Sequence, residues 1–407
     1  MSWITEQLQE EGVLGLLLFL AMCSIVWVVF LSIFWGAPFI PGPALDDDTM
    51  HRTVIYFMIR GEDFYSAWRH SVQVCVDPSD LRIYRTPIIF YLVTGLTGWA
   101  GDYFPFPLGV VCVFVAASNL LLSFWTVRRM LGSGWAGLMA AFTQYAYFFN
   151  VIPKFQISIF AMPFLILSVY WAWEKRPWLA SGSLALSFLI KESFGFALPA
   201  ILLLFLFRRR WRSALILVGT FAGAVSLYLL HLYVAQPIGD PTMLFAEPPI
   251  DVLFNIGGFL WFGFGVLYYN VFLPITIGGG YPFSPLPPFL PYPLFLVILG
   301  AQVVFVWGPL VLLCLEMLHQ RRILYPHLIL LGVVLWIFPI VISASTPVTD
   351  FALSWVDFGV YRWFAAAYVG FQLLVGVSWH QLQQCVKGEG SQTWICAQLV
   401  SLKKRVF

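Results

Sequence analysis

Long apolar runs that end in basic residues constrain this chain more than any other feature. One run covers residues 106–127 and ends at Arg128-Arg129. A later one covers 157–173 and ends at Glu174-Lys175-Arg176. A helix that crosses a bilayer needs about 20 predominantly apolar residues, and these runs come close to that length. The repeated pattern predicts an all-α polytopic membrane protein.

The composition supports this class and excludes others. The 407 residues are 60% hydrophobic and 18% aromatic, which no soluble globular domain matches. The net charge is only +2, so the chain lacks the basic face that nucleic-acid binding requires. The six cysteines show neither a metal-binding spacing nor a disulfide framework. We therefore expect a membrane protein with no nucleic-acid partner.

About ten transmembrane helices are expected, in a single domain over residues 1–380. The apolar runs are 13–35, 106–127, 135–152, 157–173, the short pair 177–190 and 194–207, then 213–234, 253–276, 294–318, 327–344 and 363–379. The apolar segment 88–99 is too short to cross alone. Prolines exclude a helix over 278–293, because they remove hydrogen-bond donors and fix φ.

The basic turns predict the orientation of these helices. Short loops rich in Lys and Arg remain cytoplasmic, which places Arg128-Arg129, Lys175-Arg176 and the tail 381–407 on that side. The loop 36–87 then lies on the non-cytoplasmic face. The same orientation leaves the run 253–276 either re-entrant or at the interface. We expect an integral multi-pass protein of the cytoplasmic (inner or plasma) membrane.

The loop after the first apolar run is the longest polar passage in the chain. It begins with Asp46-Asp47-Asp48 and also carries apolar residues at helical spacing, namely Val54, Ile55 and Met58. Such spacing favours amphipathic helices lying on the membrane surface. We expect this loop to be folded and to hold the reactive carboxylate of a lipid-dependent enzyme.

The three adjacent aspartates have more than one interpretation. An aspartate before a helix caps the free amide groups of its first turn. Three carboxylates exceed what a cap requires, and an ionised one could act as a general base toward a sugar hydroxyl. They also offer the oxygen ligands that a divalent metal prefers, although we predict no metal site and no cofactor. His51 follows Asp47 or Asp48 by one helical turn, so it could share their face or simply pack in the core.

Isolated charges in or beside the apolar runs form the second group of candidates. Ionisable groups at membrane depth are costly and usually face a cavity or a partner. Lys191 and Glu192 interrupt an apolar hairpin, either as a solvated tip, as a mutual ion pair, or as a contact to a lipid phosphate. Arg362 opens the last apolar run, where an interfacial anchor is the alternative.

Two further stretches resemble a known family. They are Gly61-Glu62-Asp63-Phe64-Tyr65 and Tyr84-Arg85-Thr86-Pro87-Ile88-Ile89-Phe90-Tyr91-Leu92, which follow the acidic cluster in that order. The arrangement resembles the GT-C superfamily of integral-membrane glycosyltransferases. It is most similar to the mannosyltransferases of glycosylphosphatidylinositol synthesis and the bacterial polyprenyl-phosphate-mannose-dependent enzymes. The second tyrosine of the family's Tyr-Arg-Tyr element is missing here.

The resemblance implies a GT-C-like bundle and a polyprenyl-phosphate sugar as donor, with a lipid, glycan or protein as acceptor. It implies that Asp47, or Asp48 beside it, is the catalytic base of an inverting transfer of a hexose such as mannose. The residues that would bind the donor phosphate are Arg85, Lys154, Lys191 and Arg362. Those that would bind substrate are His51, Tyr84 and Glu192.

Two other functions remain open at this point. A GT-C-like chain could serve as a non-catalytic subunit of a larger membrane complex. A transporter would show two similar halves with interrupted helices at matching positions. The Gly/Pro passage 278–293 has no counterpart in the first half of the sequence. The glycosyltransferase is therefore the favoured hypothesis.

Overall fold

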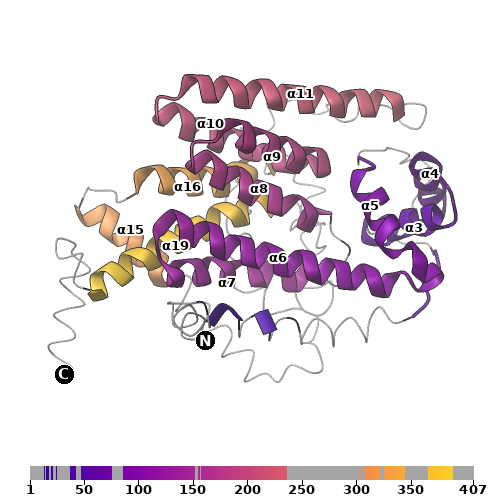
Figure 1. Cartoon of the computed structure of the whole chain (residues 1–407), viewed down its shortest axis with the longest axis horizontal. Coiled ribbons are helices and arrows are strands. Elements are labelled where there is room, and N and C mark those ends of the chain that lie inside the picture. Colours follow the sequence, from indigo (N-terminus) through magenta and orange to yellow (C-terminus); the bar gives the residue numbers. More distant parts are fainter. Residues whose placement is uncertain are drawn as a thin grey trace, which may run out of the picture.

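The computed structural model describes only part of the chain. It covers residues 37–42, 47–75, 86–151, 155, 157–235, 304, 308–320, 325–343 and 365–387, with a few positions in 13–24. These residues form helices and no strands (Figure 1). The elements are α3 (Asp47–Ile59), α4 (Phe64–Cys75), α5 (Ile88–Thr97), η1 (Gly98–Tyr103), α6 (Pro105–Leu131), α7 (Gly134–Val151), α8 (Ser158–Trp173), α9 (Pro177–Ile190), η2 (Glu192–Ala197), α10 (Leu198–Phe207), α11 (Trp211–Ala235), α15 (Gly308–Gln320), α16 (Pro326–Ser343) and α19 (Ala365–Lys387).

Most of the predicted helices are found within a few residues of their expected bounds. The short segment 88–99 is α5 followed by η1, and 194–207 is divided between the end of η2 and α10. Two described helices, α6 and α11, are long and apolar enough to cross a membrane. They support a membrane protein but do not confirm about ten spans. The runs 253–276 and 278–293, and most of 13–35, lie outside the described residues.

Local sequence explains where several helices begin and end. The helix α6 ends at Gly132, whose φ of 71° is in the left-handed region that glycine adopts without steric cost. Pro177 occupies the first turn of α9, where its missing N–H is not needed. The last described helix, α19, continues to Lys387, so part of the predicted tail 381–407 is helical.

Contacts between the helices collect the basic turns at one end of the bundle. Asn119 of α6 bonds to the carbonyl of Ile159 at the start of α8, and Trp125 stacks against Tyr170 near its end. The helices α6 and α8 therefore run parallel, and both end in basic residues. The turn after α10 joins them, because Arg208 donates to the carbonyl oxygen of Trp173 at 3.0 Å.

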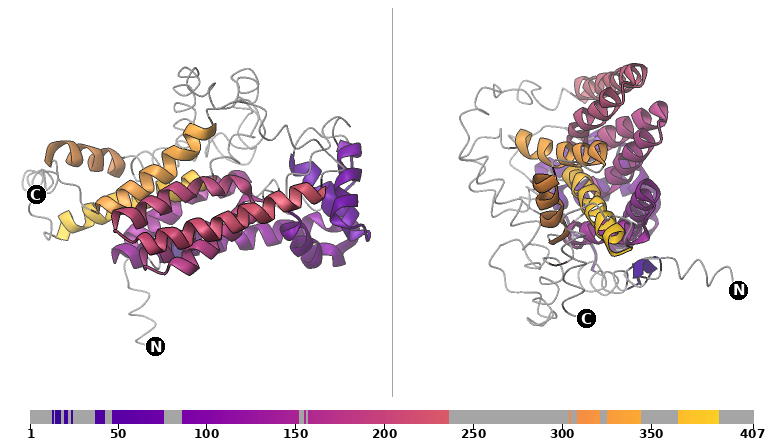
Figure 2. Two further views of the ribbon diagram at one scale, coloured as in Figure 1. Left: turned by 90° about the horizontal axis from the view of Figure 1, so that it is seen from above. Right: turned by 90° about the vertical axis from the view of Figure 1, so that its left-hand side faces the viewer.

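The helices α3, α4 and α5 form a module at the other end of the bundle. Figures 1 and 2 show them beside the first turns of α6, away from the α10–α11 connection. The face of α3 that carries Val54, Ile55 and Met58 is buried, as its spacing predicts. The helix α3 packs on α4, α5 and η1, and this end meets the first part of α6 through α5 and η1.

Close backbone contact and polar bonds hold the centre of the bundle. A Cβ placed on Gly370 of α19 would lie 2.5 Å from the carbonyl oxygen of Gly332 in α16, so only glycine permits this approach. Nearby, Gln144 of α7 donates to Gln372 of α19 and accepts from Ser123 of α6. Small residues and interhelical hydrogen bonds of this kind are how helices associate in lipid.

Candidate active site

The predicted catalytic carboxylates stand at the beginning of α3. Asp47 and Asp48 are its first two residues, and His51 follows one turn later. Residues three and four apart share a face of a helix, and His51, Val54, Ile55 and Met58 form a buried stripe along α3. We call this set the inner stripe of α3.

His51 lies in an aromatic enclosure and is only 4% exposed. Its ring centroid is 5.5 Å from that of Phe90 in α5, 6.1 Å from Trp68 in α4 and 6.2 Å from Phe155. Phe155 lies between α7 and α8 and directly follows Lys154. The connection that carries one predicted phosphate ligand therefore reaches the inner stripe of α3.

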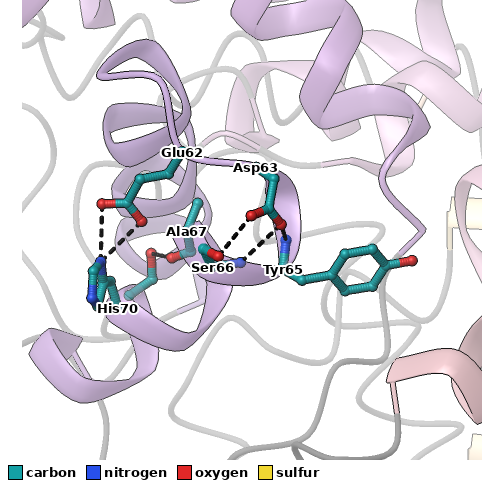
Figure 3. Close-up of polar contacts among 7 residues, drawn as sticks. Glu62, Asp63, Tyr65, Ser66, Ala67 and His70 are labelled. Carbon is teal, nitrogen blue, oxygen red and sulfur yellow. Dashed lines mark hydrogen bonds and ion pairs between the residues drawn. The ribbon is translucent and has the colours of Figure 1, made fainter.

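The turn between α3 and α4 is a tightly bonded cap. Gly61 has a φ of 95°, a conformation that an L side chain rarely adopts. The carboxylate of Asp63 accepts hydrogen bonds from the Ser66 hydroxyl at 2.7 Å and from the amides of Tyr65 and Ser66 at 2.9 and 3.2 Å (Figure 3). These bonds lower the pKa of Asp63, and the bond from the Ser66 hydroxyl has the largest effect. The family-like Gly61–Tyr65 element is thus the N-terminal cap of α4.

Two contacts extend from this cap. Figure 3 shows the Tyr65 ring pointing away from Asp63, and its hydroxyl lies 3.2 Å from Nδ1 of His231 near the end of α11. Burial raises the pKa of Tyr65, and Tyr91 and Asp63 add to the effect. On the outer side, Nδ1 of His70 lies 2.9 Å from both carboxylate oxygens of Glu62. The first contact ties α4 to α11.

A second predicted stretch reaches the break after α9. The hydroxyl of Thr86, directly before α5, donates to the carbonyl oxygen of Leu189 in α9. Leu189 precedes Lys191 by two residues. Thr86, which belongs to the described part of the family-like stretch, therefore lies near the candidate cation Lys191.

Lys191 lies where the apolar hairpin is interrupted. The residue has an extended backbone, with φ −147° and ψ 115°, between α9 and η2, and it is 4% exposed. The 14 residues of α9 rise about 21 Å from the basic turn, short of a bilayer core about 30 Å thick. Glu192 is half-buried beside it. The charged break is thus an interior feature and not a solvated tip.

One polar atom at this break has no described partner. The hydroxyl oxygen of Ser193 is buried and makes no hydrogen bond within the described part of the chain. A buried hydroxyl normally finds a partner, because leaving it unpaired costs free energy. A substrate that entered beside Lys191 and Glu192 would meet this donor.

Three of the predicted residues are described with their side chains, and the others are not. His51, Lys191 and Glu192 lie at the α3–α5 end, whereas only the helix positions of Asp47 and Asp48 are described. The predicted residues outside the described part are Tyr84, Arg85, Lys154 and Arg362. Among the described residues, no group of three or more His, Cys, Asp or Glu could hold a metal ion.

Sequence reasoning missed several residues that shape this end. The enclosure of His51 by Trp68, Phe90 and Phe155 has no sequence signal, since aromatic residues occur throughout the chain. His231 did have one, because it is the one histidine in the apolar run 213–234. Ser193 belongs to the same interruption as Lys191 and could have been included with it.

Comparison with known proteins gives a partial match to one family. Residues 86–238 match the model of glycosyltransferase family 87, a GT-C-type family. The match covers less than half of the chain; it includes Lys191 and Glu192 and begins after Asp47 and Asp48. It confirms the predicted resemblance to the GT-C superfamily and supports a glycosyltransferase in the membrane.

Two other comparisons add little to this. No match is found among curated protein sequences. Among solved structures, the chain is similar to the apo crystal structure of the oligosaccharyltransferase from Archaeoglobus fulgidus, with 12% identity and a TM-score of 0.41. The alignment covers 89% of this chain and 50% of that one, so the chain spans half the length of that protein.

Proposed function

We propose that this chain is an inverting glycosyltransferase that moves a hexose, such as mannose, from a polyprenyl-phosphate donor. The acceptor is a hydroxyl of a lipid, glycan or protein, and the reaction takes place on the non-cytoplasmic face of the cytoplasmic (inner or plasma) membrane. The observation that supports the proposal is the hydrogen bond from Thr86, just before α5, to Leu189, two residues before the buried Lys191. The same helix α5 packs through Phe90 on His51 of α3, the helix that begins at Asp47.

The aspartates of α3 suit the acceptor hydroxyl, and the cations suit the phosphate of the donor. The carboxylate of Asp47, with Asp48 as the second candidate, takes the proton of the acceptor hydroxyl as the oxygen attacks the anomeric carbon. The bond from that carbon to the phosphate oxygen breaks at the same time, which inverts the sugar. The polyprenyl phosphate leaves with the bonding electrons.

The cations stabilise the charge that develops on the leaving phosphate. Lys191 is the described member of this group, and Arg85, Lys154 and Arg362 complete it in our proposal. A desolvated ammonium interacts with a phosphate more strongly than an exposed one, because the local dielectric constant is lower. His51, Tyr84 and Glu192 would bind the sugar or the acceptor.

The depth of Lys191 favours a lipid-linked donor over a soluble one. A polyprenyl chain stays in the bilayer and presents its phosphate at the boundary of the hydrocarbon core. The end of the short helix α9 lies within the thickness of the core, where a phosphate carried by a lipid can reach Lys191 from the bilayer. A soluble nucleotide sugar would be better served by cations exposed to water.

Separate Asp47→Asn and Asp48→Asn variants test the base. The full-length protein in lipid nanodiscs is assayed with polyprenyl-phosphate mannose and with a nucleotide sugar as donors. Loss of the general base should lower kcat by about 10²–10⁴-fold in one of the two variants. Asp102→Asn is the matched control, because Asp102 is an exposed carboxylate of the same module, paired with Arg60 at 3.0 Å.

The outcomes separate the parts of the proposal. Full activity in both aspartate variants removes the proposed base. Transfer from the nucleotide sugar, but not from the lipid-linked one, would contradict the donor class. No transfer with any donor by the unaltered chain favours a non-catalytic subunit of a larger complex.

A further inference from the structure

A dense group of cations lies at the end of the bundle opposite the candidate active site. It is formed by the α8–α9 and α10–α11 turns, and we call it the basic cluster. Its members are Lys175, Arg176, Arg208, Arg209, Arg210 and Arg212. The one acidic residue in these turns is Glu174, and no ion pair to any of the six cations occurs within the described residues. The repulsion among these charges is therefore largely uncompensated by the described protein.

Specific contacts join the two turns into one surface. The guanidinium of Arg208 bonds to the carbonyl oxygen of Trp173 and lies 4.2 Å from the centroid of the Trp173 ring. Arg176 lies 5.3 Å from the centroid of the Trp171 ring. Burial and the neighbouring Arg210 lower the pKa of Arg208. A bound anion would favour the charged form of Arg208 and so oppose this lowering of its pKa.

In each turn of the basic cluster, the end of one helix meets the beginning of the next. Lys175 and Arg209 have φ values of 65° and 55°, the left-handed region that residues other than glycine seldom adopt. Each of these residues lies just after the end of a helix, and a new helix begins within two residues, α9 at Pro177 and α11 at Trp211. Helix N-termini carry partial positive charge and attract anions. The C-termini of α8 and α10 lie in the same turns and carry the opposite partial charge, so the six side chains supply the positive field.

The rim of the basic cluster is apolar and exposed. Trp178, Phe207 and Trp211 each expose more than half of their surface, and Leu215, one turn into α11, is 72% exposed. Tryptophan gathers at the boundary between hydrocarbon and headgroups. The helix α11 is also one of the two candidate spans. These surroundings favour an anion that belongs to the bilayer over one dissolved in water.

We propose that the basic cluster binds the headgroup of an anionic membrane phospholipid. The phosphate would contact the exposed Lys175, Arg209 and Arg212, while the acyl chains lie along α11 below Trp211. Basic residues directly beside membrane helices attract anionic lipids in this way. This site is separate from the donor site, which lies at the other end of the bundle, so the two can be tested independently.

The test compares the binding of two spin-labelled lipids to the full chain in phosphatidylcholine vesicles. Electron paramagnetic resonance measures the immobilised fraction of spin-labelled phosphatidylglycerol and of spin-labelled phosphatidylcholine. The decisive variant is Lys175→Asn with Arg209→Asn. Asparagine tolerates the left-handed conformation better than lysine or arginine, so the two changes remove charge without adding backbone strain. Arg212→Gln is a second, single-site variant in case the double variant does not fold.

In the unaltered protein, the immobilised fraction of spin-labelled phosphatidylglycerol should exceed that of spin-labelled phosphatidylcholine several-fold. The double variant should lower this ratio by at least about threefold. Arg128→Gln with Arg129→Gln is the matched control, since it removes the same charge at the same end outside the basic cluster. The preference should also decline at high salt, because screening weakens exposed charges. An equal loss in the control, or no preference in the unaltered protein, overturns the proposal. Displacement of the lipid by free glycerol phosphate would overturn the assignment to the bilayer.

Discussion

The two ends of the helix bundle hold their ionisable groups in opposite ways. At the α3–α5 end, His51 and Lys191 are almost completely buried, and aromatic rings and a helix break surround them. At the other end, Lys175, Arg209 and Arg212 are exposed on two short turns. The helices between the two ends are the same, so the difference lies in the connections.

This difference separates two uses of charge. Taking a cation out of water costs several kcal/mol of solvation free energy, by order of magnitude, unless partners or a ligand compensate for it. An exposed cation carries little such cost and needs no catalytic role, because it can orient the protein or attract lipid. Buried charge therefore identifies the end where chemistry is expected. The following substitutions test that assignment, beginning with the one of largest expected effect.

Replacing Lys191 should affect activity far more than replacing an exposed cation. Lys191→Met keeps the length of the side chain but removes the charge that would stabilise the leaving phosphate. We expect kcat to fall by about 10²-fold or more. Arg129→Met, in the exposed last turn of α6, is the control and should remain within about twofold of the unaltered protein. Steady-state transfer assays in nanodiscs measure both, and similar losses in the two variants would erase the distinction between the ends.

The two histidines of the α3–α4 module provide a second contrast. His51→Ala leaves a cavity among Trp68, Phe90 and Phe155, which should reduce the free energy of unfolding by about 2–4 kcal/mol. His70→Ala removes an exposed contact to Glu62 and should cost no more than about 1 kcal/mol. Thermal unfolding in detergent measures the difference.

A third histidine substitution separates the packing role of His51 from a role in substrate binding. His51→Phe fills the same aromatic enclosure without ring nitrogens, so the protein should keep most of its stability. If His51 binds substrate, the Michaelis constant should nevertheless rise by about tenfold, the equivalent of one lost hydrogen bond. An unchanged Michaelis constant would make His51 a packing residue only.

Sequence reasoning located the helices of this fold more reliably than their contacts. The bounds of α6, α8 and α9 could be predicted, because prolines and basic turns mark the ends of apolar runs. The break at Lys191 was also visible, since charges interrupt a run that is otherwise apolar. These signals are local in sequence and depend on the preference of each residue for lipid or water.

The geometry of the candidate site was not accessible in the same way. The bond from Thr86 to Leu189 joins residues 103 apart, and nothing in either neighbourhood indicates the other. The rings around His51 come from α4, α5 and residue 155, and their choice depends on how three connections pack. Such contacts are properties of the assembled bundle. The convergence of α3 with Lys191 therefore stays a prediction.

The link between the module and α11 should have a moderate effect. Tyr65→Phe removes the hydrogen bond to His231 and leaves the ring, which should cost about 1 kcal/mol. Tyr103→Phe, at an exposed position of η1, should cost almost nothing. Hydrogen exchange of the α4 amides is the sharper measurement, because loss of the link should increase exchange in α4 while leaving α6 unchanged. Equal exchange in both variants would show that α4 does not depend on α11.

The smallest expected effect concerns Asp63, an exposed carboxylate at the buried-charge end. Asp63→Ala removes the cap of α4 and should cost about 1 kcal/mol at neutral pH. The pKa of Asp63 in the folded protein is lowered from 3.8, so its stabilising contribution is present above that value and declines as the pH falls through the folded pKa. The stability gap between the unaltered protein and Asp63→Ala should therefore narrow under acid conditions. Asp63→Asn, which caps without titrating, should keep a small and constant gap to Asp63→Ala. The stability difference between the unaltered protein and Asp63→Ala could instead persist in acid, and the charge of the Asp63 carboxylate would then not be what stabilises the cap. Exposure alone would in that case no longer distinguish structural from catalytic carboxylates at this end.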